Sequence, residues 1–200
     1  MPTKLGIYML KCFDKICKNC GVIYSNPTPE TKSINTYYKN KFTNPSLKPD
    51  YNIANQVDFI KKIASKKDKI LEIGSNNNYL VKLMSSKGYE IFGRDPIANK
   101  KGKSTMKFSI ILMNHVLEHI PSPKKILKEL RLILNENGLI AIEVPNLTEY
   151  QIDNTLTLSC EHLVHYTKET LINLLNKSGY SFVFEEKKLL SRKASIRLIF

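Results

Sequence analysis

The chain has 200 residues, of which 42% are hydrophobic and 24% charged, so it has the composition of an ordinary globular protein of one domain and a short appendage. Its apolar runs are strand-sized, far below the roughly 18 residues of a membrane helix, so we expect a soluble protein with no membrane partner. The net charge of +13 would suit nucleic acid, but only 4 of the 31 basic residues are arginines, which contact phosphates and bases best. We therefore expect no nucleic-acid partner.

The N-terminus lacks the features of a secretion signal. Its apolar patch is short, and Lys11 and Cys12 follow it where a small-residue cleavage site would stand. We therefore expect a cytoplasmic protein. Three of the four cysteines, Cys12, Cys17 and Cys20, fall close together, which favours a metal-binding segment over a disulfide framework.

Residues 27–55 are rich in Pro, Asn, Thr, Tyr and Lys and lack apolar periodicity, as irregular connectors do. This predicts a boundary near residue 50, between a small N-terminal segment (1–50) and a main domain (51–200).

The main domain alternates short strands with amphipathic helices. The apolar spacing predicts helices over residues 53–64, 79–87, 123–134 and 168–177, and Gly88, Asn137-Gly138 and Gly179 end the last three. Strand patterns cover residues 69–73, 90–93, 106–113, 139–144, 181–187 and 194–200. This alternation predicts an α/β fold, a Rossmann-like doubly wound sheet that is mostly parallel.

Ligands of such sheets bind at the carboxyl ends of the strands. The first strand of the predicted sheet ends at Gly74, where a tight turn lets a ligand approach backbone amides. Asp95 follows the second strand, about 20 residues on, where an acid accepts hydrogen bonds from a ribose diol. This indicates a nucleoside-bearing cofactor, although Gly74 and Asp95 also fit plain turns.

Four segments carry a family resemblance. ILEIGSNNNYL resembles the EIGSNDG form of motif I in class I S-adenosylmethionine (SAM) dependent methyltransferases, particularly the sugar and small-molecule C-methyltransferases. MNHVLEHIPSPKKILKELRLILNENGLIAIEVPN and EHLVHYTKETLINLLNKSGY resemble later elements of the same superfamily in the same order. CKNCGVIYSNPTPETKSINTYYKNKF is similar to part of the zinc-binding head of many of these enzymes.

The resemblance implies a SAM site and assigns its residues. Those in the cofactor loop are Glu72, Gly74, Ser75 and Asn76. Asp95 would bind the ribose hydroxyls, and Asn114 and His115 would border the adenine or methionine side of the pocket.

Two departures from the family pattern stand out. Asn77 and Asn78 replace an acid and a glycine, and Asn tolerates the left-handed backbone that such a turn requires. Only 14 residues separate Asp95 from Ile110, whereas a helix and a strand with their connections need roughly 25. This predicts that the third strand of the family sheet is missing.

For catalysis, the family resemblance points to His162 as a base, with Glu161 orienting or stabilising it, because methyl transfer to carbon requires removal of a proton. A structural role for this pair is the alternative. For His119, we expect capping or packing, and His165 matches no motif.

The resemblance also implies a structural zinc ion held by Cys12, Cys17 and Cys20. Cys17 and Cys20 have the Cys-x-x-Cys spacing of a zinc knuckle, followed by Gly21. The alternative is a remnant of a longer head that no longer binds metal.

The leading hypothesis is a SAM-dependent methyltransferase acting on a small molecule, such as a sugar or sugar nucleotide. The alternative is a degenerate relative that keeps the methyltransferase fold as a binding or interaction module without catalysis.

Overall fold

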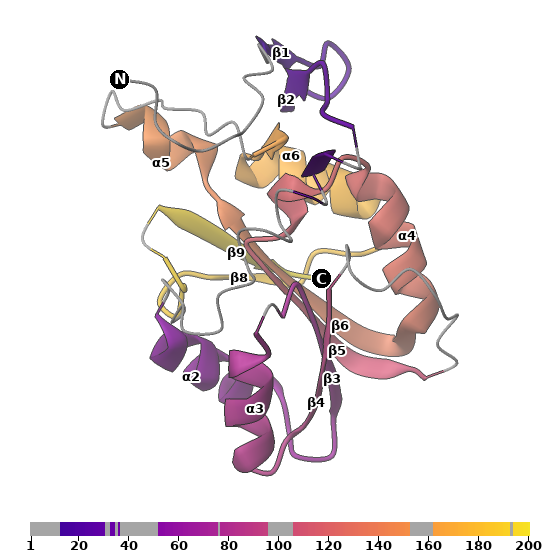
Figure 1. Ribbon diagram of the computed structural model, residues 1–200, viewed down its shortest axis with the longest axis vertical. Coiled ribbons are helices and arrows are strands. Elements are labelled where there is room, and N and C mark those ends of the chain that lie inside the picture. The colour runs from indigo at the N-terminus through magenta and orange to yellow at the C-terminus, as the bar shows by residue number, and fades with distance from the viewer. Residues whose placement is uncertain are drawn as a thin grey trace.

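A six-stranded β-sheet forms the centre of the protein, as the computed structural model shows (Figure 1). The structure describes residues 13–30, 33–34, 36, 52–75, 77–95, 106–152, 162–192 and 194–200. In sheet order, the strands are β4 (Glu90–Arg94), β3 (Lys69–Ile73), β5 (Phe108–Asn114), β6 (Leu134–Pro145), β9 (Ser195–Ile199) and β8 (Phe184–Glu186). The pairs among β4, β3, β5 and β6 are parallel, and β9 is antiparallel to both neighbours. The predicted α/β fold with a mostly parallel sheet is confirmed.

Helices cover both faces of this sheet. They are α2 (Ile53–Ile63), α3 (Tyr79–Ser86), α4 (Pro123–Ile133), α5 (Leu147–Ile152) and α6 (Lys168–Asn176), with a short 3-10 helix η1 (Leu117–His119) after β5. Ile110 and Leu112 of β5 pack with α2 and α3, whereas Ile111 and Met113 pack with α4 and α6. Because successive side chains of a strand point to opposite faces, a strand buried on both faces is a continuous apolar run. None of the described helices is both long and apolar enough to cross a membrane.

Most predicted elements appear within a few residues of their expected bounds. Gly88 and Gly179 follow α3 and α6 in left-handed conformation, with φ of +83° and +90°. The predicted cap at Asn137-Gly138 is wrong, because α4 ends at Ile133 and β6 begins at the next residue. Gly138 instead lies in β6, where a Cβ atom would be 2.8 Å from Leu134 Cδ1. This glycine therefore permits close packing within the strand.

The predicted loss of a family strand concerns the edge of the sheet at β4. Within the described residues, β4 ends the strand order. The shortened segment at residues 96–105 lies outside the described residues, so this loss stays a prediction.

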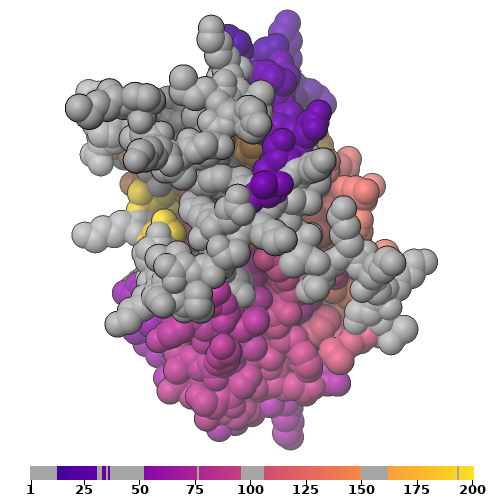
Figure 2. All heavy atoms as spheres, in the orientation of Figure 1, coloured from indigo at the N-terminus to yellow at the C-terminus, as the bar shows by residue number. Residues whose placement is uncertain are grey.

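The N-terminal segment is joined to the main domain by a second, smaller sheet. Strands β1 (Phe13–Ile16) and β2 (Ile23–Asn26) form an antiparallel hairpin, and β2 also pairs with β7 (Val164–His165), directly before α6. The Ser25 amide donates a hydrogen bond to the Leu163 carbonyl at 3.0 Å. Figure 2 shows the hairpin residues at one end of the visible face, with α2 and α3 at the other. The hairpin thus lies beside the segment that carries His162.

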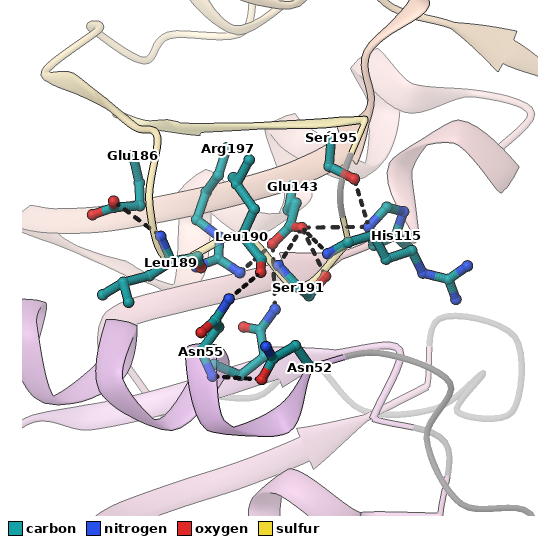
Figure 3. Close-up of polar contacts among 12 residues, drawn as sticks. Asn52, Asn55, His115, Glu143, Glu186, Leu189, Leu190, Ser191, Ser195 and Arg197 are labelled. Atoms are coloured by element: carbon teal, nitrogen blue, oxygen red, sulfur yellow. Dashed lines mark hydrogen bonds and ion pairs between the residues drawn. The ribbon is translucent and has the colours of Figure 1, made fainter. Parts of the chain in front are cut away.

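A buried ion pair between Glu143 of β6 and Arg197 of β9 links the two halves of the sheet (Figure 3). Neither side chain is exposed to solvent. The Arg197 guanidinium also donates to the Leu189 carbonyl at 2.5 Å and lies 4.1 Å from the centroid of the Phe59 ring in α2. The pair therefore ties the parallel and antiparallel strands to α2.

The Glu143 carboxylate accepts further hydrogen bonds. The Ser191 amide and hydroxyl donate to Oε1 at 2.8 and 2.7 Å, and Gln56 Nε2 donates to Oε2 at 3.3 Å. Burial alone would raise the pKa of Glu143, but His115, Arg197 and Ser191 outweigh it and lower the pKa to about 2. Glu143 is thus a carboxylate at every physiological pH.

Replacing Glu143 by Gln should lower the free energy of unfolding by about 3 kcal/mol at neutral pH, because Arg197 becomes an uncompensated buried charge. Urea denaturation measures this loss. The matched control is Glu185→Gln, which breaks the partly exposed Lys168–Glu185 pair. It should cost less than about 1 kcal/mol. Equal losses in the two variants would contradict a special role for the buried pair.

The stability contributed by Glu143 should also depend on pH. Its pKa is about 2 in the folded protein, below the ordinary 4.5, so the unfolded chain takes up this proton first as the pH falls. Glu143 therefore contributes its full share of the unfolding free energy above about pH 4.5, and this share is lost as the pH falls towards 2. The unfolding free energies of the parent and of Glu143→Gln should therefore converge in acid. A difference that stays constant down to about pH 2 would refute this.

Candidate active site

The loop after β3 contacts β4 on one side and Val116, just after β5, on the other. The Gly74 amide donates to the carbonyl of Arg94, the last residue of β4, at 2.8 Å. Gly74 has a φ of +78°, and a Cβ atom there would lie 2.4 Å from Val116 Cγ2. Both the backbone conformation and the close approach require glycine at this position.

Asn78 adopts the left-handed conformation, with φ 54° and ψ 31°, at the N-cap of α3. The predicted tolerance of Asn in this turn is confirmed for Asn78. A Cβ atom on Gly93 of β4 would lie 2.2 Å from Asn78 Oδ1 and 2.5 Å from Ser75 Oγ. The loop therefore lies tightly against β4, whereas Asn76 is outside the described residues.

Glu72, the fourth residue of β3, is buried, and its Oε2 atom has no hydrogen-bond partner within the described structure. Burial raises the pKa of this carboxyl to about 7. A buried acceptor without a donor is costly, so a ligand that brings a donor or a positive charge would be stabilised here.

Two further predicted residues end neighbouring strands. Asp95 directly follows β4, whose Arg94 pairs with Ile73 beside the Gly74 loop. Asn114 ends β5 on the other side of β3, and its Nδ2 atom is buried without a hydrogen-bond partner among the described residues. These predicted residues all lie at or near the carboxyl ends of three neighbouring strands. They are Glu72, Gly74, Ser75, Asp95 and Asn114.

His115, also predicted for this site, has a left-handed backbone with φ 52°. Its Nε2 lies 3.4 Å from Glu143 Oε1 and 3.3 Å from Ser195 Oγ (Figure 3). On the other side of the ring, Nδ1 lies 3.3 Å from Glu118 Oε1. Burial acts to lower the pKa of His115, but the two carboxylates outweigh it and raise the pKa. His115 therefore bridges two buried acids, and this bridge compensates the strained backbone.

His162 lies at the same end of the main sheet, against η1. Its ring centroid is 4.9 Å from that of His119 and 6.0 Å from that of His165. Burial, together with the nearby histidines, outweighs the opposing effect of Glu118 and lowers the pKa of His162 to about 4, so its imidazole is neutral at physiological pH. A neutral imidazole can accept a proton. Glu161, its predicted partner, is outside the described residues.

Sequence reasoning missed Glu118, which lies between these histidines. Its carboxylate is buried, 3.3 Å from His115 and 3.8 Å from His119. Burial would raise the pKa of Glu118, but His115 and His119 outweigh it and lower the pKa. The only sequence signal was a Glu directly before His119, and a charged residue in that position is ordinarily exposed.

Cys17 and Cys20 lie in the tight turn of the β1–β2 hairpin. The Gly21 amide donates to the Cys17 carbonyl at 2.9 Å, and Gly21 has a φ of +73°. Hydrogen bonds from the Asn19 and Cys20 backbone, then from the Cys20 side chain, lower the pKa of the Cys17 thiol. Both are free cysteines, and Cys12 is outside the described residues.

The fold matches solved methyltransferases at low sequence identity. The 1,6-didemethyltoxoflavin-N1-methyltransferase of Burkholderia thailandensis, solved with S-adenosylhomocysteine bound, is 11% identical, with a TM-score of 0.66 over 92% of this chain and 96% of that one. The CcbJ methyltransferase of Streptomyces caelestis is 10% identical, with a TM-score of 0.59 over 80% and 92%. The glycopeptide N-methyltransferase MtfA is 9% identical, with a TM-score of 0.56 over 74% and 88%.

None of the curated proteins matches the sequence. A family model described as a methyltransferase domain matches residues 47–184, which is more than half of the chain. The sheet order and the glycine loop at the carboxyl ends of its strands agree with that match. The chain therefore belongs to the methyltransferase domain family and is an enzyme of the methyltransferase class.

Proposed function

We propose that this chain transfers the methyl group of SAM to a small molecule bound over the carboxyl ends of β3, β5 and β6. The observation that carries the proposal is the buried Glu72 oxygen without a hydrogen-bond partner in the described structure, beside the Gly74 loop at the carboxyl end of β3. SAM bears an ammonium group and a ribose diol, which are donors for a buried carboxylate and for an acid at the end of β4.

Each predicted cofactor residue has a task in this proposal. Glu72 accepts from the ammonium group, the loop of Gly74, Ser75 and Asn76 lies along the cofactor, and Asp95 accepts from the ribose hydroxyls. Asn114 and His115 border the adenine or methionine side. Glu72 and the Nδ2 atom of Asn114 are buried, so polar contacts to them would be stronger than in water.

The methyl group of SAM is electrophilic because it is bonded to a sulfonium. In transfer, the acceptor atom forms a bond to that methyl carbon, the carbon–sulfur bond breaks, and S-adenosylhomocysteine leaves with the electron pair. The acceptor loses a proton, which we assign to His162, with Glu161 orienting its ring. Its neutral state supports this role.

The acceptor class we propose is a small molecule with an acidic hydroxyl or an enolisable carbon, such as a sugar or sugar nucleotide. Relatives of similar fold include enzymes named for a toxoflavin precursor and for a glycopeptide, so the fold accommodates small and medium-sized acceptors.

We also propose a structural zinc ion at Cys12, Cys17 and Cys20 in the hairpin. Its support is the tight Cys-x-x-Cys turn, in which the Gly21 amide donates to the Cys17 carbonyl at 2.9 Å and both thiols are free. A closed tetrahedral site requires a fourth ligand beyond these three.

SAM and S-adenosylhomocysteine should bind the purified chain in isothermal titration, and Asp95→Ala should weaken binding by at least about tenfold, because an acceptor for the ribose hydroxyls is lost. The control is Asp58→Ala, which removes an exposed carboxylate of α2 paired with Lys61 and should change nothing. A folded parent chain that gives no heat with either compound at millimolar concentration would refute the proposed cofactor.

His162→Gln should slow formation of S-adenosylhomocysteine by roughly 100-fold or more, while SAM affinity stays unchanged, because only proton removal is lost. Turnover is measured with a panel of sugar nucleotides and other small hydroxylated acceptors. His165→Gln is the control, since that ring is held towards Asp14 at 3.8 Å and should not affect turnover. Equal turnover by the parent chain and His162→Gln would refute the assignment of His162 as the base.

A second outcome would favour the non-catalytic module. The variant Asn77→Asp/Asn78→Gly rebuilds the family loop, so it tests whether the altered loop limits catalysis. If parent and rebuilt variant both bind SAM but transfer no methyl group to any acceptor of the panel, the chain is a binding module and the catalytic proposal fails.

A further inference from the structure

Glu118, His119 and His162 bring one carboxylate and two imidazoles together at the end of β5. Each offers one ligand atom, and these atoms all lie within 4.8 Å of one another. Among the residues that the structure describes, this is the one group of three or more His, Cys, Asp or Glu side chains with such spacing. We call it the His-Glu cluster.

The backbone fixes the positions of this cluster. Glu118 and His119 belong to η1, and His162 directly precedes Leu163, whose amide donates to the Glu118 carbonyl at 2.8 Å. Ser25 Oγ of β2 lies 3.4 Å from the His162 carbonyl and donates to it. Two segments distant in sequence are thus held face to face by hydrogen bonds that do not involve the side chains of the cluster.

The Glu118 carboxylate gives a second, independent indication of a ligand. The residue is 1% exposed, and neither of its carboxylate oxygens has a hydrogen-bond partner in the described part of the chain. Its nearest nitrogens, on His115 and His119, lie at ion-pair distances of 3.3 and 3.8 Å. The two imidazoles compensate the buried charge only in part, because neither makes a hydrogen bond to it, and a bound cation would stabilise it further.

We infer that the His-Glu cluster binds a divalent transition-metal ion of the zinc or ferrous type, through Glu118, His119 and His162. Two imidazoles and one carboxylate are a ligand set that these ions take, with positions left open for water or substrate. Magnesium and calcium are poor candidates, because they prefer oxygen ligands.

The ligand spacing is compatible with such an ion. Ligand atoms of a tetrahedral ion at about 2.1 Å lie about 3.4 Å apart. Closing the cluster from its 4.8 Å limit therefore requires side-chain movements of about one ångström. His119 and His162 are partly exposed and have room for this rotation, whereas Glu118 is fixed by burial.

Metal binding and proton acceptance exclude each other at His162, because a neutral imidazole has one nitrogen lone pair. The base role of His162 therefore belongs to the metal-free protein; in the loaded protein His162 would be a ligand, and the ion would supply acidification of an acceptor oxygen. The use of the site rests on the proposed function, but the binding of the ion does not. Binding is therefore measured in the absence of SAM.

The test is titration of the chelator-treated full chain with zinc, in a background in which Cys12, Cys17 and Cys20 are replaced by Ser. We expect one equivalent to bind by isothermal titration and to raise the melting temperature, because the ion binds the folded chain. Cobalt should give the visible absorption bands of a protein-bound ion. Glu118→Gln and His119→Ala should each weaken binding by about 100-fold or more, since even supporting residues of metal sites cost 10–100-fold.

His165→Gln is the matched control and should bind zinc like the background chain, because its ring is outside the cluster. His119→Ala should fold because it changes a partly exposed side chain. Glu118→Gln loses the ion pair with His115, so circular dichroism checks its fold, and His119→Ala keeps the test decisive if that variant is destabilised. Equal zinc binding by background, Glu118→Gln and His119→Ala would overturn the inference, as would no binding by the background chain.

The two proposals fail in distinguishable ways. A chain that binds zinc through the His-Glu cluster but gives no heat with SAM supports this inference and overturns the proposed function. A chain that binds SAM but no zinc overturns this inference and leaves the proposed function standing.

Discussion

The Glu143 carboxylate is the interaction on which the rest of the structure depends most. It holds Arg197 of β9, the Ser191 loop and Gln56 of α2 around one buried charge, so three separate segments meet there. Apolar packing is non-directional and leaves several sheet arrangements open. A buried charge accepts only the arrangement that satisfies it, and this one fixes the antiparallel strand beside β6.

The same carboxylate reaches the active site through His115. The imidazole lies between Glu143 and Glu118, so a line of polar contacts leads from the sheet core to the His-Glu cluster. The left-handed backbone at His115 is tolerable because carboxylates hold both ring nitrogens. The active-site end of the sheet is thus stabilised by the same polar network as the core, and stability and chemistry are not separate properties here.

Local pattern was sufficient for much of this fold. The apolar run of β5 and the spacing in α2 predict their own elements, and Asn78 takes the left-handed turn that its side-chain type allows. Gly138 shows where local pattern fails as a predictor. Its Asn-Gly pair predicts a helix cap, but the glycine lies in β6 and packs closely against Leu134. The positions of Gly74 and Asp95 at neighbouring strand ends also followed from sequence, since parallel strands bring their carboxyl ends together.

Contacts between distant segments were beyond local pattern. The residues around Glu118 in sequence do not predict that His162, more than forty residues later, lies close to it. Nor does the local sequence predict that β2 pairs with β7. Such contacts depend on the whole chain, and their energy comes from burial that only the assembled fold provides.

The pairing of β2 with β7 bears on how this protein can evolve. The ladder joins the N-terminal hairpin to the strand that follows His162, so the hairpin packs directly behind that histidine. A domain that hangs from a linker can be exchanged between genes without loss. Here, recombination within the connector would separate two halves of one sheet, so the head and the catalytic domain are expected to be inherited together and to change in concert.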